Sequence, residues 1–230
     1  MKTYKEILKD IEKARANKSA AEKRQNVIID EIHGAPDLLS KKEARSAAAD
    51  ELKKVSEKIL DLNIAIKLLK NNARVALFNE LKPVISETFN KYAGKPYGEK
   101  TRAKISDEIH ARTGCRCYIY AEYLHSQRIE IYSGSNDYNI TVGYPGNSEQ
   151  KLLIDNKVQA VDPEQLQLYY IKREYFDDIP AAIKAMKKAY KKALEKQKEL
   201  ETICEQFNFY AVDGIERIYK DKYICPTFRG

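Results

Sequence analysis

The chain has 230 residues, a formal net charge of +7 and 43% hydrophobic residues, so it can bury a sizeable core and suits a helix-rich soluble protein. No apolar run approaches the roughly 18 residues that a membrane span needs, and no apolar leader precedes the first helical pattern, so we expect no membrane segment and no signal peptide. Four cysteines are too few to indicate a disulfide framework, which favours free thiols and a cytoplasmic location.

A seven-residue apolar repeat marks the first two predicted helices, residues 3–33 and 41–81. Apolar residues spaced three and four apart fall on one helical stripe, and a repeat sustained over several heptads favours coiled-coil-like packing. Gly34 and Pro36 interrupt the pattern between the two stretches. Such a short connection forces the helices to run antiparallel, so we expect a helical hairpin over residues 1–82.

The seam of this hairpin is weak in the middle of its first helix, at Lys18, Ala21 and Gln25. These side chains cannot bury much apolar surface in a contact between two helices. A partner helix, including one from a second copy of the chain, could therefore complete the seam. We expect the projecting part of the hairpin, around residues 15–55, to be the contact or self-association element.

Pro83 should kink or end the second helix near Leu81, because proline removes a backbone hydrogen bond inside a helix. A shorter helix should follow as far as Tyr92. Glycine and proline then break the pattern at residues 93–98, and a helical pattern returns over residues 99–113.

From Cys115 onward the apolar pattern alternates, which predicts strands instead of helices. Alternation over residues 116–124, 128–132 and 139–143, with a hairpin at 151–161, predicts an antiparallel sheet of three to five strands at about 115–161. One face carries isoleucine and valine and should pack on the preceding helix. The other face carries tyrosine and arginine and should point outward.

A second helical block follows the sheet. Asp162 and Pro163 are typical of a helix start and predict a short helix to about Tyr175. The third heptad stretch predicts a long helix at about 180–208. Near the end of the chain, residues 209–212 and 215–224 could be strands that close the sheet.

These elements predict an α+β fold. It consists of a long antiparallel, coiled-coil-like hairpin, a small antiparallel sheet and a third long helix packed on the body. We expect two domains: the helical hairpin at 1–82, and an α+β domain at 83–230.

The sequence contains no glycine-rich phosphate loop, no nucleophile elbow and no HExxH zinc motif. We therefore expect a protein without catalytic activity or cofactor. His110, Cys115, Cys117 and His125 are of types that zinc accepts. Their spacing is not typical of a zinc module, and two cysteines on a predicted strand are better explained as small core residues. We expect no metal site.

Two segments concentrate positive charge and are candidate sites for nucleic acid or another partner. The first segment, residues 95–104, holds Lys95, Lys100, Arg102 and Lys104. The second, residues 184–192, holds Lys184, Lys187, Lys188, Lys191 and Lys192. A lysine stripe can contact phosphates and give salt-dependent binding to nucleic acid. It can equally be the solvated back of a coiled-coil helix.

The outward face of the predicted sheet is a third candidate, because Arg116, Tyr118 and Tyr120 share it with Tyr132. Exposed aromatic rings on a sheet can stack unpaired bases. Tyrosine also favours strands on its own account. Residues 115–176 hold six basic and eight acidic residues, about −2 overall, which argues against nucleic acid at this face.

The stretch NKYAGKPYGEKTR at residues 90–102, following a heptad hairpin, resembles small phage and prophage proteins of low-GC Gram-positive bacteria. The resemblance covers about a tenth of the chain. It implies an accessory protein that binds host machinery, for example an inhibitor of a defence nuclease such as a CRISPR effector. Many such inhibitors are acidic mimics of nucleic acid, and a basic chain departs from that pattern. Inhibition here would occlude a protein surface or bind the nucleic acid itself.

The sequence therefore predicts non-enzymatic binding to a host protein or nucleoprotein, with the hairpin as the contact element or as a homodimer interface. The alternative is a basic nucleic-acid-binding protein that uses the lysine segments and the tyrosine face.

Overall fold

A computed structural model describes residues 1–34, 42–120, 127–134, 138–145, 148–169 and 174–206. The chain divides into two compact units, Met1–Asp177 and Asp178–Gly230, and each is described by itself. The expected α+β fold is confirmed: two long helices pack together, and the chain forms a four-stranded antiparallel sheet and a small two-stranded sheet. The strands predicted at 209–212 and 215–224 lie outside the described residues.

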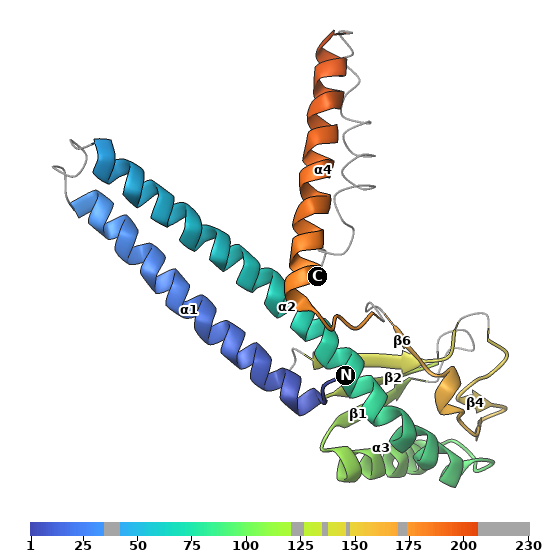
Figure 1. Cartoon of the computed structure of the whole chain (residues 1–230). Coiled ribbons are helices and arrows are strands. Elements are labelled where there is room, and N and C mark those ends of the chain that lie inside the picture. Colours follow the sequence, from blue (N-terminus) through green and yellow to red (C-terminus); the bar gives the residue numbers. More distant parts are fainter. Residues whose placement is uncertain (35–41, 121–126, 135–137, 146–147, 170–173, 207–230) are drawn as a thin grey trace. The chain divides into compact units, whose positions relative to one another are not determined.

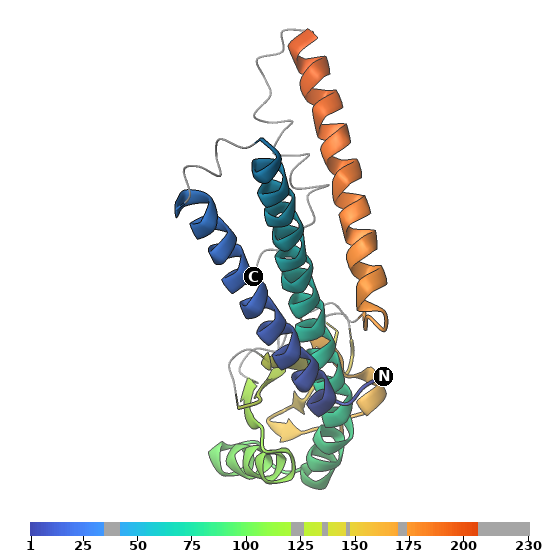
Figure 2. The same cartoon turned by 60° about the vertical axis from the view of Figure 1, so that its left-hand side comes forward.

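Helices α1 (Tyr4–Gly34) and α2 (Lys42–Tyr92) form the predicted antiparallel hairpin (Figures 1 and 2). The repeat of α1 places Ile7, Ile11 and Ile28 against α2, and each is only 1% exposed. The second half of α2 is buried on more than one side, because Ala73 and Ala76 pack with α1 whereas Leu77 and Leu81 belong to the core shared with the sheet. The hairpin therefore projects from a body that is built around the second half of α2.

Small and polar side chains fill the weak part of the hairpin seam. Ala21 is buried, and Gln25 donates from Nε2 to the hydroxyl of Ser56 at 2.9 Å. Nearby, Arg24 forms an ion pair with Glu51 at 2.7 Å. These contacts close the seam within one chain, and self-association through the hairpin stays a prediction.

Helix α2 runs through Pro83 without ending, so of the two predicted outcomes, a kink or an end near Leu81, the end was wrong. Proline removes one backbone hydrogen bond, but the residues beyond it are tightly packed. Ile85 and Phe89 are fully buried in the main core. The burial of these two large side chains stabilises the helix. This stabilisation is larger than the free-energy cost of the one hydrogen bond that proline removes.

Helix α3 (Glu99–Thr113) lies against the sheet, with Ile105 and Ile109 fully buried. It ends where Gly114 takes a left-handed conformation with φ 71° and donates its N–H to the His110 carbonyl oxygen at 2.8 Å. This glycine cap turns the chain directly into the first strand.

The main sheet contains β1 (Arg116–Tyr120), β2 (Arg128–Tyr132), β3 (Ile140–Gly143) and β6 (Gln167–Tyr169) in the order β1-β2-β3-β6. All neighbours are antiparallel, and Cys117 pairs with Ile131 and Ile119 with Ile129. These apolar residues face a common core with α2 and α3, as the alternation predicted. The opposite face of β1 and β2 therefore carries the tyrosines and arginines.

The predicted hairpin near residues 151–161 forms a separate two-stranded sheet, β4 (Leu153–Ile154) and β5 (Lys157–Val158). Asp155 and Asn156 have φ of 49° and 57°, which suits a two-residue hairpin turn. The Gln127 side chain ties this sheet to the main one through both backbone groups of Leu153, at 2.8 and 3.0 Å.

The helix predicted from Asp162 to Tyr175 was wrong. Among the described residues of this range, 162–169 and 174–175, the helical part is a single 3-10 turn, η3 (Pro163–Gln165), and the Asp162 side chain accepts a hydrogen bond from the Glu164 N–H. The chain then becomes β6, because β3 offers an unpaired edge and Leu168 reaches the core by alternation. Gly143 permits this pairing, since a Cβ there would lie 2.9 Å from the Tyr169 ring.

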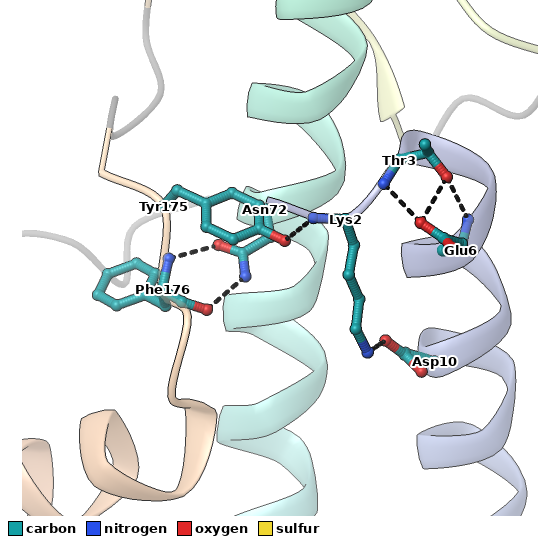
Figure 3. Close-up of polar contacts among 7 residues, drawn as sticks. All are labelled: Lys2, Thr3, Glu6, Asp10, Asn72, Tyr175 and Phe176. Atoms are coloured by element: carbon teal, nitrogen blue, oxygen red, sulfur yellow. Dashed lines mark hydrogen bonds and ion pairs between the residues drawn. The ribbon is translucent and has the colours of Figure 1, made fainter.

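Residues 174–176 are tied to α2 and to the start of α1 (Figure 3). The Asn72 side chain bonds both backbone groups of Phe176, at 2.8 and 2.9 Å. The Tyr175 hydroxyl accepts a hydrogen bond from the Lys2 backbone N–H at 3.1 Å. The two ends of the first unit are thereby joined.

The second unit contains α4 (Ile179–Gln206), which begins where the Asp178 side chain accepts a hydrogen bond from the Ala181 N–H. This start agrees with the sequence expectation, and the packing of α4 on the body stays a prediction. Across the described residues, no helix combines the length and the apolar character that a membrane crossing requires.

Candidate nucleic-acid interface

The outer face of β1 and β2 forms an open groove of about 640 Å³. We call it the tyrosine groove. It is lined by His110, Gly114, Arg116, Tyr118, Tyr120, Tyr132 and Gly134. The register explains the grouping, because Arg116 lies opposite Tyr132 and all three β1 side chains point away from the core. Three of the predicted site residues, Arg116, Tyr118 and Tyr120, are thus brought together.

The aromatic rings of the groove are held by their neighbours. The rings of Tyr118 and Tyr132 meet edge to face, with centroids 5.4 Å apart. The Arg128 guanidinium lies 4.9 Å from the centre of the Tyr120 ring. Tyr118 nevertheless remains 51% exposed and Tyr120 remains 42% exposed. Edge-to-face and cation–π contacts fix the rings and leave aromatic surface accessible.

The one carboxylate of this face among the described strand residues, Glu130, is fully engaged. It accepts hydrogen bonds from Arg128 Nε at 3.0 Å and from the Tyr132 hydroxyl at 2.8 Å. The bond to Glu130, together with burial, raises the pKa of Tyr132. Tyr132 therefore stays neutral at physiological pH, and the negative charge of Glu130 is matched by Arg128.

The acidic balance of the region does not describe the groove. Five of its eight acids belong to other segments: Glu149, Asp155, Asp162, Glu164 and Glu174. Glu122 and Asp137 lie outside the described residues. The described residues that line the groove include an arginine and a histidine and no carboxylate, and Glu130 lies opposite Tyr118 on the same sheet face. Four of the six bases, Lys151, Lys157, Lys172 and Arg173, also belong to other segments, so strands β1 and β2 carry Arg116 and Arg128 against Glu130.

The other predicted cations do not line the groove. The Lys95 ammonium lies over the Tyr92 ring at 4.7 Å. The backbone carbonyl of Lys95 accepts a hydrogen bond from the Val158 N–H at 3.0 Å. The segment at residues 93–98 is therefore tied to β5. Helix α3 carries Lys100, Arg102 and Lys104, which are exposed and do not line the groove. This first lysine segment is a separate surface from the tyrosine groove.

The five lysines of α4 belong to the second unit. Lys191 lies 3.9 Å from Glu195, one helical turn further along α4. Such a pair is typical of a solvated helix face and contributes little to stability. A role for Lys184, Lys187, Lys188, Lys191 and Lys192 in binding stays a prediction.

The two cysteines near the groove are buried core residues. Cys115 and Cys117 are free thiols, and burial raises the pKa of each. Thiols with a raised pKa are poor nucleophiles and poor metal ligands at neutral pH. His125 lies outside the described residues, and within the described ranges no three His, Cys, Asp or Glu side chains gather in the manner of a metal site.

Sequence reasoning missed His110 as a groove residue, because it weighed this histidine only as a metal ligand. His110 stands one residue after the buried Ile109, at the end of α3. Only the Gly114 turn brings that helix end beside β1, and a turn direction is not visible in an apolar pattern. Gly114 and Gly134 were missed as lining residues for the same reason.

Comparison of the chain with protein-family models, curated proteins and solved structures gives no match.

Proposed function

We propose that this protein is a non-enzymatic binding protein that holds single-stranded nucleic acid in the tyrosine groove. The observation that carries the proposal is the combination of exposed tyrosine rings with the guanidinium of Arg116 in one groove, whose described lining residues include no carboxylate. Proteins that bind single strands without sequence preference combine a positive groove with aromatic stacking surfaces.

Each part of the groove has a role in this proposal. Tyr118 and Tyr120 supply ring surface for stacking with unpaired bases, which is worth about 1–3 kcal/mol per base. Arg116 and His110 lie beside the rings and can contact phosphate oxygens. The volume of about 640 Å³ is in the range of sites that hold a small ligand or part of a strand.

Fluorescence anisotropy with labelled single strands tests this proposal. Tyr118→Ala should weaken binding roughly 10- to 100-fold, because it removes a stacking surface. Tyr118→Phe keeps the ring and should bind like the unmodified protein. If Tyr118→Ala binds single strands as tightly as Tyr118→Phe, the groove does not stack bases and the proposal fails.

A protein or nucleoprotein partner at the same groove is the second candidate. Tyrosine and arginine are enriched among the residues that dominate the energetics of protein interfaces, and the groove presents both. A host nuclease is one such partner, as implied by the resemblance of residues 90–102 to phage proteins. This candidate predicts that Tyr118→Ala abolishes capture of the protein partner and has no effect on nucleic-acid binding.

Under the protein candidate the hairpin can also carry the contact. Alanine changes along the part of the hairpin around residues 15–55 would then destroy partner binding, and charge reversal at Lys184, Lys188 and Lys191 would not. Loss of binding on that charge reversal, with a flattened salt dependence, would instead favour nucleic acid.

A further inference from the structure

The middle of the helical hairpin contains a band of positive charge. On α1, no acid occurs between Glu12 and Glu22, whereas Lys13, Arg15 and Lys18 do. On α2, no acid occurs between Asp61 and Glu80, and the cations of that stretch are Lys67, Lys70 and Arg74. We call these six cations the basic band. Both helices are more evenly charged on either side of it.

The antiparallel packing brings the two acid-free stretches level with each other. Near one end of the hairpin, the Tyr4 N–H donates to Glu80 at 2.7 Å. Toward the other end, Gln25 bonds Ser56 at 2.9 Å. The three cations of the band on α1 and the three on α2 all lie between these two contacts, so the basic band occupies one level of the hairpin.

A groove of about 580 Å³ runs between the helices at this level. Its lining residues come from both helices: Arg15, Lys18, Glu22, Asn63, Ile66, Lys67 and Lys70. Four of the seven are cations. The single carboxylate, Glu22, lies 3.3 Å from the Lys18 ammonium, so its charge is already matched. The described lining residues therefore carry a net positive charge of four cations against one carboxylate.

We infer that the basic band binds the phosphate backbone of a nucleic acid. The cations extend along the seam on two helices, which fits a polyanion better than a single small anion. Among the described lining residues Ile66 is the one apolar side chain, so the groove offers little to an apolar partner helix. No aromatic ring lines it, and binding should therefore not require unpaired bases.

This site differs from the tyrosine groove in both residues and ligand form. It should accept a duplex, because it contacts phosphates and needs no unpaired bases. The inference does not depend on the proposed function, since blunt duplex DNA reports on the basic band without offering bases for stacking.

The test measures binding of a blunt, labelled DNA duplex to the full chain by anisotropy at several salt concentrations. The double variant Lys67→Gln/Lys70→Gln should bind the duplex more weakly and lower the slope of log affinity against log salt by about one per lysine. The matched control is Lys53→Gln/Lys54→Gln, which makes the same charge change at exposed positions of the same helix. The control should bind like the unmodified protein.

Two further variants keep the test decisive. Lys67→Arg/Lys70→Arg retains both charges and should retain duplex binding, and Arg15→Gln/Lys18→Gln should reproduce the loss from the opposite helix. Equal weakening by the Lys67/Lys70 and Lys53/Lys54 glutamine variants would show an effect of net charge alone and would overturn the inference. Unchanged binding in Lys67→Gln/Lys70→Gln would also overturn it. Tyr118→Ala should leave duplex binding intact. A wrong assignment of the basic band can therefore be told apart from a wrong assignment of the tyrosine groove.

Discussion

Asn72 shows how a single residue connects distant parts of the chain. It is only 2% exposed, and both polar groups of its side-chain amide are used by the backbone of Phe176 (Figure 3). This pairing resembles one rung of a β-ladder made by a side chain. Asn71 adds a bond to the Glu174 carbonyl oxygen at 2.8 Å, so two adjacent residues of α2 hold one extended segment.

Replacing Asn72 with alanine should destabilise the first unit by about 1–3 kcal/mol, because it leaves the partly buried backbone groups of Phe176 without partners. Urea unfolding followed by circular dichroism measures this loss. The control is Asn79→Ala, at an exposed position on the same helix, which should change stability by no more than about 0.5 kcal/mol. Equal stability of the two variants would contradict the role assigned to Asn72.

Glu6 gives the start of α1 a dependence on pH. Its carboxylate accepts hydrogen bonds from the Thr3 N–H and hydroxyl, both at 2.8 Å. These bonds, the backbone one first, lower the pKa of Glu6 below its usual 4.5. A carboxyl whose pKa is lowered by folding contributes its full stabilisation above the unfolded pKa and loses it as the pH falls through the folded value.

The unmodified protein should therefore lose stability as the pH falls below about 4.5, and Glu6→Gln should lose less over the same interval. Thermal unfolding midpoints between pH 7 and pH 3 measure the difference. Glu12→Gln, at an exposed position on the same helix, is the control and should follow the unmodified protein. Parallel pH profiles for Glu6→Gln and the unmodified protein would rule out this contribution.

At the scale of elements, apolar period and caps predicted the hairpin, α3, α4 and the first three strands of the main sheet. Both errors came from local signals that tertiary packing overrode. Pro83 is a helix breaker by itself, but Ile85 and Phe89 hold α2 together beyond it. Asp162 and Pro163 do start a helical turn, but the free edge of β3 captures the following residues as β6.

The hairpin should depend on the buried positions of its repeat and not on their neighbours. Ile28 is 1% exposed and Val27 is 45% exposed, so adjacent residues provide a matched pair. Ile28→Ala should destabilise the hairpin by about 2–5 kcal/mol through lost packing and a cavity. Val27→Ala should cost less than about 0.5 kcal/mol. Similar unfolding curves for the two variants would mean that the α1–α2 seam is not the one described.

At the scale of the whole molecule, the sequence predicted part of each surface but not how the parts combine. Strand alternation placed Arg116, Tyr118 and Tyr120 on one face. The regional charge count does not isolate this face, because five of the eight acids and four of the six bases belong to other segments. The basic band was missed for a different reason. Its two acid-free stretches lie far apart in the sequence, and only the hairpin register brings Lys18 level with Lys67.

Photo-crosslinking of single-stranded DNA that carries a photoreactive pyrimidine, followed by mass spectrometry of the crosslinked peptides, tests the central claim most directly. Reactive bases that stack on aromatic rings should attach to Tyr118 or Tyr120, and Tyr118→Ala should reduce that yield. A duplex of the same sequence should give little crosslinking at these tyrosines. Crosslinks confined to α1, α2 or α4, with none on β1, would contradict the assignment of the tyrosine groove as the site for single strands.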